Sequence, residues 1–466
     1  MQAGETLFFL FSRRSGILAA SDMSWTAEQV IALAPDASAA KSGKDLSVPR
    51  KWKTLGMEPN CAWGTIQGSG QDPYQTCVDL GGLAFKCTCP SRKFPCKHGL
   101  GLLLIVAQQP GAMTEKQPPA WTTEWIARRS EKERKSAKAG TPEAPPDPEA
   151  EKKAAAAADK RAASREAKVS AGLDELGIWL GDLVRNGFAT LPGKPSSFWE
   201  TPAARLVDAQ APGLARRVRA LDGISTTGER WPTRLLREAS LLHLVREGWL
   251  RITSLPPATQ ADIRTVIGFT ANQEEALEQA GVQDQWLVVG QCVEEDERLK
   301  VQRSWLFGAA SRRFALSLSF SASPNQPLDI TLAPGTVLDA ELVFFRGAWP
   351  LRALVKQRQR SPTTTAVGLP HETIATANAL AAEAFTANPW LERIPFGLAA
   401  VMPSRRAHGW IVRDAAGCCL PLRISDADAW KLVALAGGCP MALAGEWDGE
   451  QLRPLSVWAE GRFLRV

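Results

Sequence analysis

The spacing of hydrophobic and polar positions changes several times along the chain, and each change marks a new structural unit. In residues 61–80 apolar and polar side chains alternate, as in YQTCVDL at 74–80, which is the period of a half-buried strand. The run GLGLLLIVAQQPG at 99–111 places apolar residues at helical spacing instead. This part of the chain is therefore predicted to fold as strand, strand, a cysteine-containing loop and a helix.

A helix start precedes these strands. Thr26, followed three residues later by Gln29, has the spacing of a capping box, and Trp25 with Val30 can form the flanking hydrophobic staple. These signals begin directly after Met23, whereas residues 1–22 show no periodicity that would tie them to a core. We therefore expect the protein to start at Met23 and its first domain to span residues 23–126.

A charged stretch rich in Ala and Pro follows at residues 127–170. It contains no aromatic residue and almost no large aliphatic one, so it cannot bury enough surface to fold alone. We predict a linker here, and its Ala, Lys and Glu content permits transient helix near residues 150–168. Residues 171–270 return to helical spacing, which predicts a helical module.

The last part of the chain, residues 271–466, contains clustered strand-like runs such as WLVVGQC at 286–292. Helical patterns interrupt the runs near residues 372–386 and 426–436. Because the strands are clustered and do not alternate with helices, this part is predicted to be α+β with mainly antiparallel strands. The sequence assigns no role to it.

Composition limits the class of protein. The chain has 466 residues, which predicts two to four domains, and its 45% hydrophobic and 22% charged residues are ordinary for globular proteins. No run approaches the ~18 apolar residues of a membrane span. LFFLF at residues 7–11 is shorter than the roughly 7 to 15 residues of a secretory signal core. We expect a soluble, cytoplasmic protein that does not bind membranes.

The net charge of +6 is unevenly distributed. The formal balance is +2 for residues 1–126, +4 for 127–170 and 0 for 171–466. Binding to a polyanion requires clustered cations, and the excess lies mostly in the predicted linker. The charge therefore gives little support for nucleic-acid binding.

Nine cysteines are too few for a disulfide scaffold in a chain of this length, but three of them crowd into one segment. CTCPSRKFPCKH places Cys87, Cys89, Cys96 and His98 as Cys-x-Cys, six residues, Cys-x-His. Three thiolates and an imidazole are a common ligand set for tetrahedral zinc. Since all four positions are filled by protein, we predict one structural zinc ion and a small zinc-stabilised ββα module.

Four cations lie beside these ligands, and two roles are open to them. Three thiolates and one dication leave about one negative charge, which Lys86, Arg92, Lys93 and Lys97 can neutralise. Alternatively, Arg92, Lys93 and Lys97 contact a partner or a nucleic acid directly. The first role is favoured.

The cysteine segment resembles the SWIM zinc-finger family, whose signature is Cys-x-Cys, a variable gap and Cys-x-His. The similarity extends over about residues 23–126, through WGTIQGSGQDPYQTCVDL and CPSRKFPCKHGLGLLL, and AARLVDAQAPGLA is similar to the helical part of long bacterial members. The resemblance implies a module that binds DNA or protein. It also implies an accessory role beside MoxR-type ATPases and proteins with von Willebrand A domains.

No constellation of catalytic residues accompanies the zinc ligands. His243, His371 and His408 are far apart in sequence and have no locally spaced acid or nucleophile. We therefore expect a non-catalytic adapter for a protein partner or an ATPase-containing complex. A DNA- or RNA-binding protein is the second hypothesis, and an enzyme in the C-terminal domain is a weaker third.

Overall fold

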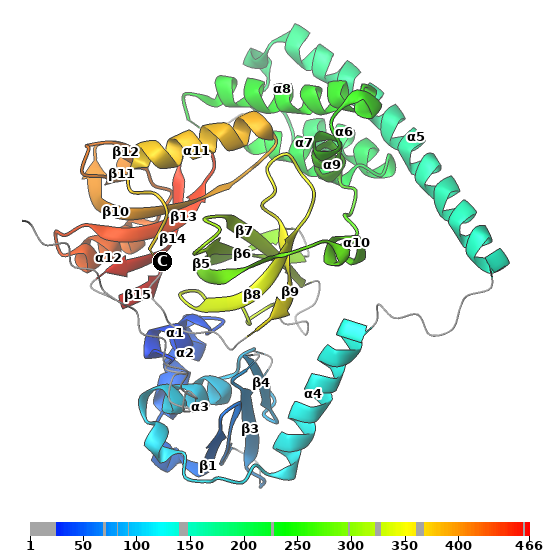
Figure 1. The fold of residues 1–466 in the computed structure, drawn as a ribbon. Helices are drawn as coiled ribbons and strands as arrows, with labels where there is room; N and C mark the ends of the chain where they lie inside the picture. The colour runs from blue at the N-terminus through cyan, green and yellow to red at the C-terminus, as the bar shows by residue number, and fades with distance from the viewer. Residues whose placement is uncertain are drawn as a thin grey trace, which may run out of the picture. The chain divides into compact units, whose positions relative to one another are not determined.

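The computed structural model describes residues 25–68, 71–81, 83–91, 93–138, 148–224, 228–296, 299–321, 328–359, 368–459 and 462–466. The chain forms two compact units (Figure 1). Among the described residues, the first unit covers residues 25–119 and the second covers those from residue 120 onward. No described helix is both long enough and apolar enough to cross a membrane. The expected start at Met23 and residues 1–22 lie outside the described residues.

The first unit combines a four-stranded sheet with three helices. Its elements are α1 (Ala27–Ala32), α2 (Ala37–Leu46), β1 (Trp52–Glu58), β2 (Cys61–Ile66), β3 (Tyr74–Asp79), β4 (Ala84–Cys87) and α3 (Lys97–Gln108). The strands pair in sequence order, each antiparallel to the next. The predicted capping box is confirmed, because Gln29 N donates to Thr26 Oγ1 and Thr26 N donates to Gln29 Oε1.

Helix α3 is the centre of this unit. It is apolar on all sides, and its residues from Leu100 to Val106 are buried. A helix with this pattern must be covered on every face. α3 accordingly packs against α1 and α2 as well as against β2 and β3. The predicted strand, strand, loop and helix are present, and β1 and β4 are additional strands.

The second unit begins with helices: α4 (Ala120–Lys138), α5 (Pro148–Asn186), α6 (Ser197–Asp208), α7 (Pro212–Ile224), α8 (Trp231–Leu250), α9 (Pro257–Ile267) and α10 (Gln273–Glu278). Leucines such as Leu173 and Leu242 form the core shared by α5 to α9. α5 starts inside the segment predicted as a linker, and Val169 is fully buried in the core. The helical module therefore includes the end of that segment, because α5 supplies apolar residues only toward its C-terminal half.

Two antiparallel sheets follow. The five-stranded sheet has the order β7-β6-β5-β8-β9, from β5 (Val282–Asp296), β6 (Leu299–Gly308), β7 (Phe314–Ser321), β8 (Val337–Phe344) and β9 (Ala353–Arg358). The six-stranded sheet has the order β12-β11-β10-β13-β14-β15, from β10 (Ile394–Arg406), β11 (Gly409–Arg413), β12 (Cys419–Pro421), β13 (Met441–Trp447), β14 (Leu452–Ala459) and β15 (Arg462–Arg465). All pairings in both sheets are antiparallel.

The two sheets share a core. Leu287 and Trp305 of the first sheet pack with Ala444 and Leu455 of the second. Helices α11 (Ile374–Ala387) and α12 (Asp426–Ala436) both pack on β10. The prediction of a multidomain α+β protein with mainly antiparallel strands and two interrupting helices is confirmed.

Candidate metal centre

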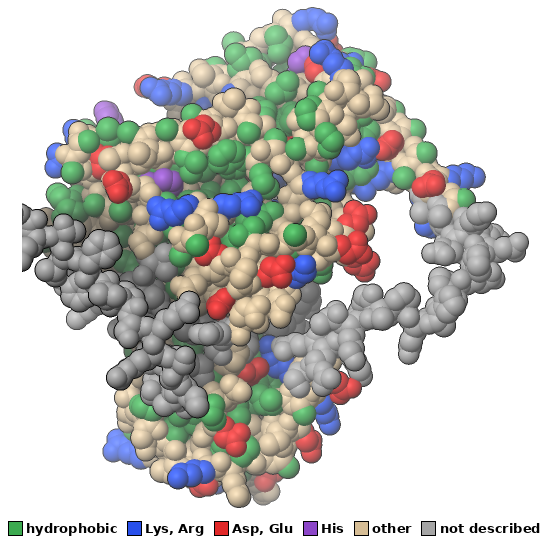
Figure 2. Space-filling model, viewed as in Figure 1, with side chains coloured by type: hydrophobic (Ala, Val, Ile, Leu, Met, Phe, Trp, Pro, Cys, Tyr) green, Lys and Arg blue, Asp and Glu red, His purple; other side chains and the backbone are tan. Residues whose placement is uncertain are grey.

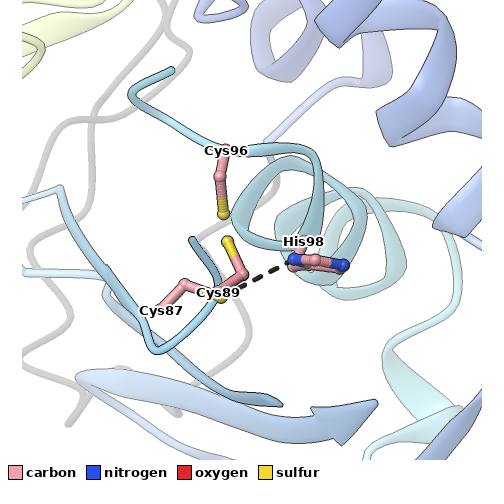
Figure 3. A group of neighbouring side chains, drawn as sticks. All are labelled: Cys87, Cys89, Cys96 and His98. Carbon is pink, nitrogen blue, oxygen red and sulfur yellow. Dashed lines mark hydrogen bonds between the residues drawn. The ribbon is translucent and has the colours of Figure 1, made fainter. Parts of the chain in front are cut away.

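The four predicted ligands come from two neighbouring backbone segments (Figure 3). Cys87 is the last residue of β4 and Cys89 follows it in the loop, while Cys96 is the N-cap of α3 and His98 lies in its first turn. The Leu100 amide donates to the Cys96 carbonyl, which starts the helix at the third ligand. The strand end and the helix start therefore present two ligands each to one point.

The distances between the ligand atoms fit a single ion. One atom from each of the four residues lies within 4.8 Å of all the others, and Cys87 Sγ is 3.7 Å from His98 Nδ1. Zinc bonds of about 2.3 Å to sulfur and 2.0–2.1 Å to nitrogen place neighbouring tetrahedral ligands about 3.5–3.8 Å apart. No other cluster of this kind occurs among the described residues.

The surroundings orient the ligands. The side chains of Cys96 and His98 are buried, and the Tyr74 ring lies 5.2 Å from the His98 ring. The Thr76 hydroxyl is 3.2 Å from Cys87 Sγ. Partners of this kind hold a ligand in place, and their loss commonly weakens metal binding. β3 therefore supports the site although it supplies no ligand.

The thiols also perturb one another's protonation. Interactions with Cys87 and Cys96 lower the pKa of Cys89 below its usual range, whereas interactions with Cys87 and Cys89 raise the pKa of Cys96. Three thiols this close cannot all ionise without a compensating charge. A dication supplies that charge and stabilises all three thiolates together, with release of their protons.

The donor set therefore fits one zinc ion held by Cys87, Cys89, Cys96 and His98. When bound, zinc joins β4 to α3 and contributes folding free energy to a small module. All four tetrahedral positions are occupied by protein, which leaves none for a water molecule or a substrate.

Comparison with protein families supports the same reading. Residues 79–107 match the SWIM zinc finger, and this range includes all four ligands and most of α3. Residues 164–267 match the SWIM-associated four-helix bundle domain. The chain therefore contains a SWIM zinc finger and the helical domain associated with it. No curated protein and no solved structure matches the chain.

The SWIM-associated domain extends from the C-terminal part of α5 to the end of α9. It starts at residue 164, within the segment predicted as a linker. Two contacts explain why: Glu166 is paired with Arg264 of α9 at 2.7 Å, and Arg165 donates to the Gly268 carbonyl at 3.0 Å. These polar residues join the bundle through ion pairs and hydrogen bonds, which hydrophobic spacing does not reveal.

The three predicted contact residues around the SWIM finger have different environments. Lys93 Nζ lies 2.8 Å from a carboxylate oxygen of Asp36, the N-cap of α2. Lys97 is exposed at the first position of α3. Arg92 lies outside the described residues. Of the two cations that the structure describes, Lys93 is thus engaged within the unit and Lys97 is exposed.

A buried cluster of charges in the second unit was not predicted. Glu446 has no exposed surface and accepts hydrogen bonds from Arg303 Nε at 2.7 Å and from the Trp305 indole at 2.8 Å. Arg303 also donates two hydrogen bonds to Glu294, each of 2.9 Å. This cluster joins the two sheets. Its members are distant in sequence, so local spacing contains no signal for it.

Proposed function

We propose that the chain is a cytoplasmic, non-catalytic adapter that binds a protein partner. The observation that carries the proposal is the closed ligand set of Cys87, Cys89, Cys96 and His98. A zinc ion with four protein ligands stabilises a fold, whereas a catalytic zinc keeps a position for water or substrate. The SWIM finger in this proposal is a shaped surface and performs no chemistry.

The environments of two histidines support the non-catalytic part of the proposal. His371 is buried between Phe314 and Phe396, and its Nδ1 accepts a hydrogen bond from the Gly397 amide. Burial, with a contribution from the Arg312 charge, lowers its pKa to about 4, which keeps the ring neutral. His243 is exposed and lies 4.0 Å from Glu247 on the same helix. His371 is thus a hydrogen-bonded residue of the core, and His243 is a surface residue of α8.

The distribution of surface side chains supports a protein partner over a nucleic acid. On the face shown in Figure 2, basic and acidic side chains are interspersed. The helical bundle in addition exposes aliphatic side chains, among them Ile178 at 67% and Leu250 at 56%. An apolar groove of about 360 Å³ between α5 and α6 includes Trp179 and Phe198. Apolar surface with a mixed charged rim is typical of protein interfaces.

Nucleic-acid binding through the SWIM finger is the second candidate. Lys86 and Lys97 flank the ligand pairs, both are exposed, and neither is paired with an acid in the described part of the chain. Two lysines suffice for weak electrostatic attraction to phosphates. They also suffice to offset the negative charge that three thiolates leave on a bound zinc ion.

The proposed class of partner is an ATPase-containing complex of the MoxR or von Willebrand A type. Its support is the resemblance to bacterial SWIM proteins described above. In such a complex the adapter contributes binding surfaces and the ATPase supplies the energy.

The test is affinity capture from native lysate with the tagged, zinc-loaded full chain, with and without nuclease. We expect a specific protein to stay bound after nuclease treatment and to be lost with a Cys89→Ser variant. The matched control is Cys61→Ala, which alters a buried cysteine of the same unit that is not a ligand. Loss of all captured protein after nuclease treatment would support the nucleic-acid candidate instead.

A further inference from the structure

A polar cleft of about 230 Å³ lies in the second unit between the helical bundle and the six-stranded sheet. Helices α7 and α8 form one side, and the segment before β10 and the β13–β14 turn form the other. Two hydrogen bonds join the sides: Arg217 donates to the Trp390 carbonyl at 2.7 Å, and the Trp390 indole donates to the Leu241 carbonyl at 3.1 Å. The walls are therefore held together at one end.

The lining has an excess of positive charge. Five arginines and four carboxylates line the cleft, and the arginines are Arg217, Arg234, Arg237, Arg393 and Arg423. Three of them lie within 3.4 Å of an acid that also lines it: Arg217 lies 3.1 Å from Glu392, Arg234 lies 3.1 Å from Glu450, and Arg423 lies 3.4 Å from Asp448. The ion pairs of Arg237 and Arg393 are longer.

These two guanidinium groups have unused donors. The nearest acid to Arg237 is its sequence neighbour Glu238 at 3.8 Å, and Arg393 lies 3.6 Å from Glu294 and 3.8 Å from Glu446. The side chain of neither arginine donates a hydrogen bond to a described residue. Glu294 and Glu446 already accept hydrogen bonds from Arg303. Both guanidinium groups retain solvent exposure, with side chains 43% and 22% exposed.

We propose that this cleft binds the phosphoryl group of a small molecule through Arg237 and Arg393. Arginine forks match the oxygens of phosphate, and a dianion can accept from two of them at once. The volume is below the roughly 300–1,000 Å³ of most ligand pockets, so phosphate or a short phosphomonoester fits better than a nucleotide. Leu241 and Leu391 also line the cleft and offer apolar contact to a carbon chain.

The carboxylates of the cleft make the site selective. Asp448 and Glu450 lie in the β13–β14 turn, at one wall. Their charges oppose an extended polyanion while a compact group beside Arg237 and Arg393 is tolerated. Because the walls belong to different modules, a ligand that contacts both of them raises the stability of the second unit.

The test uses the zinc-loaded full chain and calorimetric titration with inorganic phosphate and with glycerol phosphate, and with acetate at matched ionic strength. We expect saturable binding of one or both phosphates and no saturable binding of acetate. Tighter binding of glycerol phosphate identifies a phosphomonoester as the ligand, and equal or tighter binding of inorganic phosphate identifies the free ion. Arg237→Gln should weaken binding about tenfold or more, the loss expected for a charged hydrogen-bonding partner.

The matched control is Arg251→Gln, which removes an exposed arginine at the C-cap of α8, outside the cleft, and should leave the affinity unchanged. Arg393→Lys keeps the charge beside Glu446 but removes the fork, and should also weaken binding. Circular dichroism establishes that each variant is folded. The proposal is overturned if neither phosphate binds saturably, if acetate binds equally well, or if Arg237→Gln and Arg251→Gln have the same effect.

Discussion

Gly101 of α3 lies directly against Leu46 of α2. A Cβ atom on Gly101 would be 2.9 Å from the Leu46 Cβ and 3.2 Å from its carbonyl carbon. The arrangement is reciprocal, because a Cβ on Gly43 of α2 would be 2.9 Å from the Leu100 Cβ. The two glycines let the helices cross closely, and α3 is the helix that carries Cys96 and His98 at its start.

We expect Gly101→Val to lower the free energy of unfolding of the first unit by about 1–3 kcal/mol, since the added atoms meet backbone that cannot move aside easily. Hydrogen exchange of residues 25–119 during urea titration measures the effect. The control is Gly111→Ala, because a Cβ at Gly111 has no atom within 4 Å. Gly111→Ala should change the free energy of unfolding by no more than about 0.5 kcal/mol. If the two substitutions had equal effects, the close crossing of α2 and α3 would be contradicted.

Removal of a zinc ligand should unfold the first unit alone. We expect Cys89→Ser to lower the zinc content below one ion per chain. It should also abolish the protection of residues 25–119 from hydrogen exchange, because metal binding supplies the folding energy of small modules. Elemental analysis and hydrogen exchange measure the two effects.

Cys61→Ala is the control for the zinc prediction. Burial raises the pKa of Cys61 to about 11, with further contributions from Glu58 and Asp79, so this residue is a neutral thiol. The variant should keep its zinc. Its free energy of unfolding should fall by about 1 kcal/mol, because the substitution leaves a small cavity. Freshly purified wild-type protein without zinc would end this interpretation of the site.

Glu446→Gln should destabilise the second unit by about 2–4 kcal/mol. The change leaves Arg303 short of one buried anionic partner, and breaking a buried ion pair from one side is costly. Chemical denaturation measures the loss. Glu295→Gln is the control, since Glu295 is 72% exposed and, among the described residues, is paired with Lys300 alone; the change should alter stability by less than about 1 kcal/mol.

Asp262 makes stability depend on pH. Burial raises its pKa to about 6, although the Ala348 amide donates to its carboxylate and opposes the shift. The folded state therefore binds its proton more tightly than the unfolded chain, whose Asp pKa is about 3.9. The contribution of Asp262 to the free energy of unfolding therefore rises as the pH falls from about 6 to 4, and it is lower at neutral pH.

We expect Asp262→Asn to raise the free energy of unfolding at pH 7 by about 1–3 kcal/mol. The variant should also lose the part of the pH dependence of stability that comes from Asp262. Asp284→Asn should have the opposite sign. Burial raises the pKa of Asp284, but hydrogen bonds from Ser311, Ala310 and Gln285 outweigh it and hold the pKa below its usual value. Denaturation between pH 4 and 8 compares the two variants, and equal signs would refute the assignment.

Nucleic-acid affinity should be weak and sensitive to salt. Affinity falls with salt by a slope of about −0.9 per phosphate contact on duplex DNA, and the described part of the SWIM finger has two exposed, unpaired lysines, Lys86 and Lys97. We expect binding of labelled duplex DNA to disappear near physiological salt and to weaken further in a Lys86→Ala, Lys97→Ala double variant. Sub-micromolar affinity at physiological salt would favour the nucleic-acid candidate over the adapter.

The zinc ligands were predictable from sequence because they lie within a short segment. A strand end and the following helix start bring Cys87 Sγ to 3.7 Å from His98 Nδ1, and β3 supports the site without supplying a ligand. The capping box at Thr26 and the helices near 372–386 and 426–436 were predictable for the same reason. In each case the sequence signal lies within a few residues, although α11 and α12 also pack on β10.

Strand β1 shows where hydrophobic spacing is insufficient. Its burial does not alternate regularly, because Trp52, Leu55 and Gly56 are buried while the residues between Trp52 and Leu55 are exposed. Pairing with β2 stabilises the strand, and Gly56 lies opposite Trp63 in that pairing. The sequence pattern of β1 alone therefore gives a weak signal for a strand.

The sequence by itself determined the order of the modules, the antiparallel strands and the zinc ligand set, since these depend on local spacing. Only the tertiary structure decided which charges meet. Glu446 and Arg303 are 143 residues apart, and Arg237 and Arg393 line one cleft from different modules. A buried charge or a shared cleft is specified by the packing of whole sheets and helices, because the partner that compensates a charge can come from any part of the chain.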